Sequence, residues 1–249
     1  MKRITALFFA TLVLGCSILQ PEKKDDDAAR WIAAWLMMQT PGWEWNECRT
    51  WSGERNFIYN AGYQAAYATD FNFYSAWIRG NSTMDLTRQY PGWSASSTAN
   101  RSVSGNTLCD MIEQVVSMPL GAVKFVLIAT TGGNGILRGI PNDRVIDSGG
   151  IIIRQTRALH PSALIGAISV HPTLVASANA NKGAVNSGIK AHLNADGNGC
   201  WIDTLPVFGK SEGEPADVSQ MYPNDNIHYN ESMAWAIREA INTACGRYP

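Results

Sequence analysis

The sequence has no marked excess of charge of either sign, since 20 basic residues stand against 21 acidic ones and 16% of all residues are charged. This balance excludes a protein that binds nucleic acid through a generally basic surface. No apolar run reaches the ~18 residues that a membrane-spanning helix needs. No two cysteines have the spacing of a zinc knuckle, and His160, His171 and His192 lack metal-ligand spacing. We therefore expect neither a nucleic-acid partner nor a metal, and nothing in the sequence implies an organic cofactor.

What the chain does contain is enough apolar material for a folded core. It has 249 residues, of which 45% are hydrophobic, so it is long enough for one large domain or two small ones. Nine Trp and eight Tyr in a weakly charged chain favour a cleft or surface that contacts sugars or lipids.

The first sixteen residues have the pattern of an export signal. Two basic residues precede an apolar stretch at 4–14, which is too short to cross a bilayer. The stretch ends in Val-Leu-Gly-Cys, which resembles the lipobox of bacterial lipoproteins, where the cysteine, here Cys16, becomes the lipidated first residue. An ordinary cleaved signal is the alternative. The resemblance implies a cell-envelope lipoprotein held to the membrane by its lipid, and Ser17 at the second mature position implies transit to the outer membrane.

Four segments follow from this pattern. We expect a signal peptide at 1–15, a flexible tether with a Lys-Lys-Asp-Asp-Asp run at 16–28, an aromatic extension at 29–70 and a main domain at 71–249. The extension either packs on the main domain or forms a platform for substrate. The remaining four cysteines permit two disulfides in an exported protein, in any of three pairings: they are Cys48, Cys109, Cys200 and Cys245.

From about residue 71, short apolar runs alternate with longer amphipathic ones. Strand-helix alternation predicts an α/β fold in which helices cover both faces of a parallel sheet. Ligands bind beyond the carboxyl ends of the strands in such sheets, so functional residues should follow each apolar run. The expected strands are 73–78, 123–129, 163–170 and 200–207, and the expected helices are 107–117, 144–159, 182–193 and 230–244.

Polar segments follow two of these strands, open one helix and precede the last, and the first three of them contain glycine. A serine at a strand-to-helix turn can expose its hydroxyl above the sheet beside free helix amides. Aspartate three residues before a histidine can reach the imidazole, which titrates near neutral pH. The four segments are Gly80-Asn81-Ser82, Ser104-Gly105-Asn106-Thr107, Gly132-Gly133-Asn134 and Asp225-x-x-His228.

Their order resembles the four blocks of the SGNH (GDSL-type) hydrolase superfamily over about residues 71–245. The resemblance implies a three-layer α/β/α sandwich with a mostly parallel sheet of about five strands, flavodoxin-like in its topology. It also implies that Ser82 is a nucleophile, His228 its base and Asp225 the residue that orients the imidazole. The oxyanion would be held by the backbone N–H groups of Ser82 and Gly105 and by the side-chain amide of Asn134.

Two positions depart from the family pattern. Asn81 replaces the usual Asp before the nucleophile, which preserves a hydrogen-bonding role but no role for charge, and Gly135 replaces the Asp that often follows the block's Asn. Two other patterns fit less well. Ser94 lies in a near match to the G-x-S-x-G elbow with no strand before it, and the glycines around Gly133 miss the spacing of a phosphate loop.

The sequence therefore predicts a lipid-anchored serine esterase that forms an acyl-enzyme. The substrate would be a small-molecule, glycan or lipid ester, and the envelope setting with its many aromatic residues favours an acetylated glycan. The alternative is a binding or structural lipoprotein that keeps the fold but has lost catalysis, which Asn81 favours. An acyltransferase using the same residues would have to exclude water from the site. Nothing in the sequence determines the oligomeric state.

Overall fold

The computed structural model describes residues 76–95, 97–113, 123–129 and 131–247. The expected signal peptide, tether and aromatic extension, with Cys16 and Cys48, lie outside these residues. Within the described part of the chain, no helix is long and apolar enough to cross a membrane.

Five parallel strands form one sheet in the order β2-β1-β3-β4-β5. The central strand β3 is buried along its whole length, as expected for a parallel strand covered on both faces. The strands are β1 (Ala76–Arg79), β2 (Thr98–Asn100), β3 (Phe125–Ile128), β4 (Leu164–Ile168) and β5 (Gly199–Ile202).

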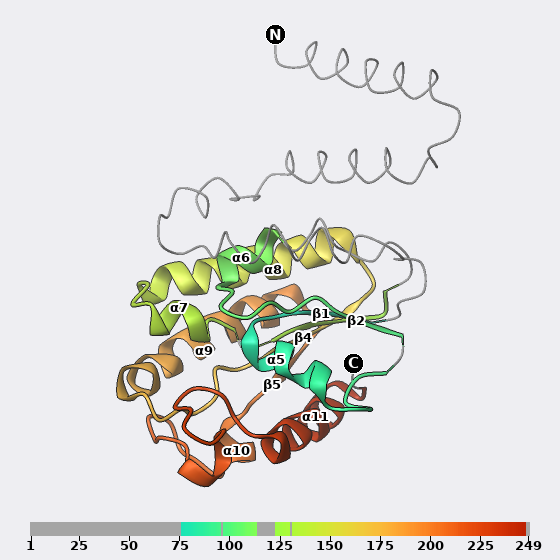
Figure 1. Ribbon diagram of the computed structural model, residues 1–249. Helices are drawn as coiled ribbons and strands as arrows, with labels where there is room; N and C mark the ends of the chain where they lie inside the picture. The colour runs from blue at the N-terminus through green and yellow to red at the C-terminus, as the bar shows by residue number, and fades with distance from the viewer. Residues whose placement is uncertain (1–75, 96, 114–122, 130, 248–249) are drawn as a thin grey trace, which may run out of the picture. The chain divides into compact units, whose positions relative to one another are not determined.

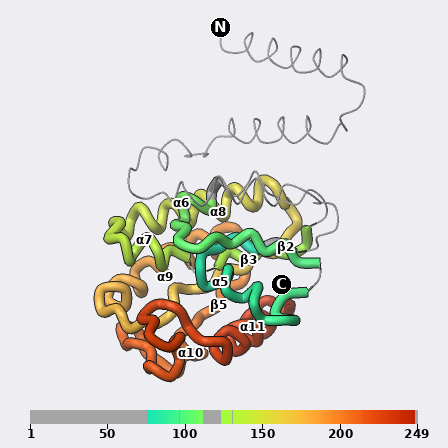
Figure 2. Tube along the Cα trace, viewed as in Figure 1, coloured from blue at the N-terminus to red at the C-terminus, as the bar shows by residue number. Residues whose placement is uncertain are grey.

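Helices cover both faces of the sheet, which confirms the predicted three-layer fold (Figure 1). One face carries α5 (Ser82–Leu86), α10 (Leu205–Phe208) and α11 (Glu231–Cys245). The other face carries α6 (Leu108–Glu113), α7 (Gly133–Leu137), α8 (Asn142–Leu159) and α9 (Ala176–Asp196). Figure 2 traces the same arrangement, with α10 and α11 on the side away from α6, α7 and α8. Two 3-10 turns are η1 (Thr87–Gln89) and η3 (Val218–Gln220).

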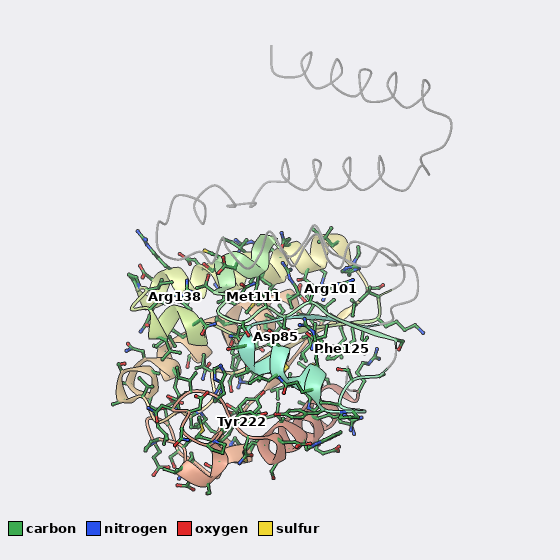
Figure 3. All side chains as sticks on the ribbon, viewed as in Figure 1. Asp85, Arg101, Met111, Phe125, Arg138 and Tyr222 are labelled. Atoms are coloured by element: carbon green, nitrogen blue, oxygen red, sulfur yellow. A yellow bond between two sulfur atoms is a disulfide. The ribbon has the colours of Figure 1, made fainter. Side chains whose placement is uncertain are left out.

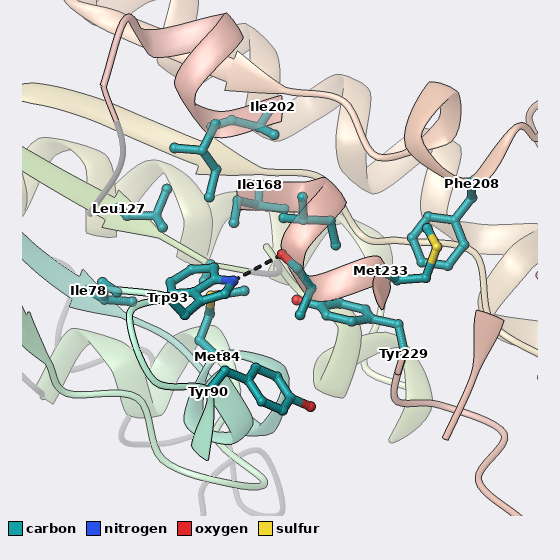
Figure 4. Packing of buried hydrophobic residues seen from close by; sticks show 14 of the residues in the cluster. Ile78, Met84, Tyr90, Trp93, Leu127, Ile168, Ile202, Phe208, Tyr229 and Met233 are labelled. Atoms are coloured by element: carbon teal, nitrogen blue, oxygen red, sulfur yellow. Dashed lines mark hydrogen bonds between the residues drawn. The ribbon is translucent and has the colours of Figure 1, made fainter. Parts of the chain in front are cut away.

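The layer under α5 and α11 has an aromatic core. Trp93 is fully buried, and its indole N–H donates to the carbonyl of Ala234 on α11 at 3.0 Å (Figure 4). Phe208 and Tyr229 bury their rings in the same cluster beside Met233. A buried indole needs a partner for its N–H, so Trp93 links the segment after α5 to the last helix.

A disulfide joins Cys200 on β5 to Cys245 at the end of α11, across a sequence separation of 45 residues. Of the three cysteines with which Cys200 could pair, its partner is therefore Cys245. A crosslink of this length stabilises the fold by about 4 kcal/mol in the chain-entropy picture. The closed loop contains Asp225 and His228, so the crosslink also restrains the segment that carries them.

Most predicted elements are present with shifted ends, and two differences are informative. The predicted strand at 200–207 ends at Ile202, and its last residues form α10, in which Pro206 is one of the first two residues. Proline has no N–H to give to a sheet and suits the first turn of a helix, so the strand interpretation of 205–207 was wrong. β2 was not expected, because Thr-Ala-Asn is short and polar.

Candidate active site

The strand order places a topological switch between β1 and β3, where successive connections leave toward opposite faces of the sheet. Ligand sites in open parallel sheets lie beyond the carboxyl ends of the strands at such a switch. Ser82 follows β1 at the start of α5, and Asn134 follows β3 at the start of α7. Both predicted site residues therefore stand at the switch.

The turn from β1 into α5 exposes the Ser82 hydroxyl. A Cβ on Gly80 would meet the Ser102 hydroxyl oxygen at 2.6 Å, so only glycine fits this close approach. Asn81 is the N-cap of α5, and its side-chain oxygen accepts from the Thr83 backbone N–H at 3.2 Å and from the Thr83 hydroxyl at 2.7 Å. Asparagine caps helices as well as aspartate does, so the hydrogen-bonding role of this position survives the departure from the family pattern.

Asp225 and His228 lie on a tight loop before α11. Tyr222 closes it, because its N–H donates to the His228 carbonyl and its carbonyl accepts from the Asp225 N–H, both at 3.0 Å. Asn224 takes a positive φ of 63°, which asparagine tolerates better than most residues. The loop thus holds the carboxylate and the imidazole on one turn of backbone.

The structure brings the three predicted residues together in one hydrogen-bonded chain. The Nε2 atom of His228 lies 2.6 Å from the Ser82 hydroxyl oxygen, 146 residues away in sequence. The Nδ1 atom of His228 lies 2.6 Å from one carboxylate oxygen of Asp225. The other carboxylate oxygen accepts from the backbone N–H groups of Ile227 at 2.7 Å and His228 at 2.9 Å.

These contacts fix the tautomer of His228. A carboxylate only accepts hydrogen bonds, so the imidazole carries its proton on Nδ1 and turns the Nε2 lone pair toward the Ser82 O–H. Burial alone would raise the pKa of Asp225. The hydrogen bonds from His228 and from the Ile227 N–H outweigh it, so the pKa of Asp225 lies below its ordinary value. Asp225 is therefore an anion at neutral pH.

The segment that carries Gly105 is tied to α5. One carboxylate oxygen of Asp85 accepts from the Ser104 hydroxyl at 2.8 Å and its N–H at 3.2 Å, and the other pairs with Arg88. Arg88 in turn donates to the carbonyls of Asn100 at 2.9 Å and Ser102 at 2.6 Å. Asp85 and Arg88 were not predicted as part of the site. Nothing in the short segment after Ser82 indicates that its side chains will bind the backbone of residues 100–104.

The segments that carry Gly105 and Asn134 are also hydrogen-bonded to one another. The Asn134 side-chain amide donates to the Asn106 carbonyl at 2.8 Å, which leaves its second N–H for another acceptor. Arg138, at the end of α7, donates to the Gly105 carbonyl at 2.7 Å. Gly105 has φ of +79°, a conformation that favours glycine. In Figure 3, Asp85 on α5 and Arg138 beside α7 mark the two elements that hold this loop.

A small hollow lies near the hydrogen-bonded chain, although Ser82, Asp225 and His228 are not among the residues that line it. Asn81 and Thr83, which flank Ser82 in sequence, line it together with Ile227, which precedes His228. Its volume is about 20 Å³, which is space for roughly one water-sized group. The other lining residues are Gly133, Asn134, Leu137, Val170, His171, Thr173 and Ala178.

Other candidate sites receive no such support. Ser94 directly follows the buried Trp93, whose carbonyl accepts a hydrogen bond from Arg238 of α11. No strand of the described chain leads directly into Ser94. Among the residues that the structure describes, no group of three His, Cys, Asp or Glu side chains is placed to hold a metal ion.

No family model matches the sequence, and no curated protein sequence matches it. Solved structures do resemble the chain. A GDSL-like lipase from Bacteroides thetaiotaomicron aligns at TM-score 0.55 and 16% identity, over 74% of this chain and 93% of that one. A variant of an acetyl-xylooligosaccharide esterase from Geobacillus Stearmophilus aligns at 0.56 and 14%, over 72% and 96%. An esterase from Pseudoalteromonas sp., solved with monoethylphosphonate as inhibitor, aligns at 0.51 and 17%, over 71% and 97%. The chain therefore has the SGNH hydrolase fold that its motifs implied.

Proposed function

We propose that this chain, built on the SGNH hydrolase fold, is a serine esterase that hydrolyses short-acyl carboxylic esters. The observation that carries the proposal is the hydrogen-bonded chain from Ser82 through His228 to Asp225. Three polar groups from two segments far apart in sequence, aligned with the tautomer that nucleophile activation needs, favour an esterase over an inactive binding protein with the same fold. The similar solved structures include a lipase and two esterases, which agrees with this reading.

The proposed reaction has two steps. In the first, the Ser82 oxygen attacks the ester carbonyl as its proton passes to Nε2 of His228, and the imidazolium then protonates the departing alcohol. In the second, His228 takes a proton from water as the water oxygen attacks the acyl carbon, and the imidazolium then returns a proton to the Ser82 oxygen as the bond to the acyl group breaks and a carboxylic acid leaves. Asp225 stabilises the imidazolium in both steps. The N–H groups of Ser82 and Gly105 and the free amide N–H of Asn134 would stabilise the oxyanion.

The small hollow lined by Asn81 and Thr83, the residues on either side of Ser82 in sequence, supports a short acyl group. We assign this hollow as the acyl site, because space for one water-sized group accepts the methyl of an acetyl ester but not a longer chain. An acetylated glycan or other acetyl ester is thus favoured over a long-chain lipid. The aromatic extension, which the sequence offers as an alternative platform for substrate, lies outside the described residues.

Acyl-length preference is the test of this substrate class. We expect kcat/KM to fall at least tenfold from p-nitrophenyl acetate to the butyrate, because the two extra methylenes do not fit the hollow. Leu137, half-buried on α7, lines the hollow, and Leu137→Ala should raise the butyrate-to-acetate ratio about tenfold. The matched control is Leu86→Ala, a half-buried leucine on α5 that does not line the hollow and should leave the ratio unchanged. Equal activity on acetate and octanoate would refute the short-acyl proposal.

We also propose that Cys16 is lipidated and anchors the protein in the cell envelope, on the strength of the Val-Leu-Gly-Cys pattern alone. Cys16→Ala should move the protein from the membrane fraction to the aqueous fraction without changing the activity of the main domain. Detergent phase partitioning measures this directly. If the variant stayed in the membrane fraction, the anchor would lie elsewhere.

A further inference from the structure

His171 is a buried histidine that the proposed reaction does not use. It lies shortly after β4 and directly before Pro172, and it is 5% exposed. Its Nε2 atom lies 2.8 Å from the carbonyl oxygen of Ile227, the residue directly before His228. A carbonyl only accepts, so His171 carries its proton on Nε2 and donates it.

The segment around His171 is itself held rigidly by α9. Asn186 accepts from the Val170 N–H at 2.8 Å and donates to the Val170 carbonyl at 3.2 Å. Asn179 does the same for Thr173, accepting at 3.0 Å and donating at 2.8 Å. The two asparagines are seven residues apart and so share one face of the helix. They bracket His171 on both sides.

A second bond joins the same segment to the loop that carries Asp225 and His228, which we call the triad loop. The N–H of Leu174 donates to the Asn226 carbonyl at 2.9 Å. Two consecutive carbonyls of the loop, those of Asn226 and Ile227, are therefore bound by one fixed segment. Of these two bonds, the one from His171 reaches the peptide unit between Ile227 and His228, whose N–H donates to Asp225.

His171 is also neutral at working pH. Burial lowers its pKa from the ordinary 6.5 to about 4, assisted by the nearby charges of His228 and Lys182 and opposed by the bond to Ile227 and the charge of Asp225. A neutral ring adds no charge beside His228. The ring lies edge-to-face with Tyr229 at 4.9 Å and stacks on Phe208 at 5.8 Å between centroids.

We infer that His171 is a positioning residue, which sets the Ile227–His228 peptide so that the imidazole of His228 points at Ser82. The inference rests on the proposed esterase function. The physical reason is that Asn179 and Asn186 of α9 hold the segment around His171, and His171 in turn holds Ile227. These hydrogen bonds make the triad loop rigid. A loop that is free to shift by about 1 Å would cost about a hundredfold in rate.

The test compares variants at His171 that differ in reach. His171→Gln keeps an amide N–H at nearly the distance of Nε2, whereas His171→Asn is one methylene shorter and His171→Phe keeps the ring without a donor. In the full chain, we expect kcat to fall 10- to 100-fold in the Asn and Phe variants with KM within about twofold. The Gln variant should stay within about threefold of the wild-type kcat. Phe208→Leu removes the stacked ring but no hydrogen bond, and should leave kcat unchanged.

A spectroscopic measurement separates positioning from loss of packing. The proton between His228 Nδ1 and Asp225 should give a downfield NMR resonance in the wild type and in the Gln variant, and this resonance should be lost or shifted in the Asn variant. Should the Phe variant fail to fold, the Asn and Gln pair carries the comparison. Unchanged kcat and resonance in the Asn variant, or an equal loss in Phe208→Leu, would overturn the inference. A wild type without esterase activity would instead refute the proposed function, while the resonance would still test the role of His171.

Discussion

Replacing His228 with alanine should lower kcat for p-nitrophenyl acetate by about six orders of magnitude, as loss of the histidine base does in a serine protease. The reason is that the Ser82 hydroxyl lies 2.6 Å from Nε2 of His228, the base placed to take its proton. A serine hydroxyl without a base is a weak nucleophile at neutral pH. Stability should change little, because His228 is half-buried and packs at the edge of the site. Steady-state kinetics and thermal unfolding measure the two effects separately.

The matched control for this variant is His192→Ala. His192 is also half-buried but lies on α9, where it packs against Gly150 of α8. It should retain wild-type kcat. Retained turnover in His228→Ala, with the protein folded, would refute the assignment of His228 as the base.

Replacing Asp225 with asparagine should lower kcat by about four orders of magnitude while the loop keeps its shape. The amide oxygen can still accept from the N–H groups of Ile227 and His228, so the backbone bonds persist. The amide nitrogen then faces Nδ1 of His228 and donates to it, which moves the imidazole proton to Nε2. In that tautomer Nε2 cannot accept the Ser82 proton, so the chain of hydrogen bonds remains and its direction is reversed.

Asp217→Asn controls for loss of one negative charge, since Asp217 pairs with Lys210 on the exposed surface at 2.6 Å. Its kcat should match that of the wild type. If Asp225→Asn lost less than tenfold in kcat, Asp225 would have no role in holding the tautomer, and the loop's own backbone would suffice to orient His228.

The fold was predictable where burial and local pattern agree. β3 and β4 are continuous apolar runs because both faces of a parallel strand are covered, and the sequence shows them as such. β2 was missed because three residues at an edge carry no hydrophobic pattern. α7 was missed because its sequence, Gly-Asn-Gly-Ile-Leu, is poor in helix formers, and it is kept by contacts with α8 and α9.

The site was predictable only in part. Ser82, Asn134 and the Asp225–His228 pair stood out because each lies where a strand ends or a helix begins, and parallel strands bring such ends together. The supporting residues did not. Asn179 and Asn186 recur at a helical spacing, but nothing local shows that they bind backbone groups of the segment after β4. Such side chain-to-backbone bonds depend on how the layers pack.

Reaction of the full chain with a fluorophosphonate, followed by peptide mass spectrometry, tests the central claim most directly. Such a probe phosphorylates a serine when a base and an oxyanion site activate it. We expect one adduct, on Ser82, formed by the wild type and absent from His228→Ala. An adduct on another serine, such as Ser94, or no adduct on the folded wild-type protein, would contradict it.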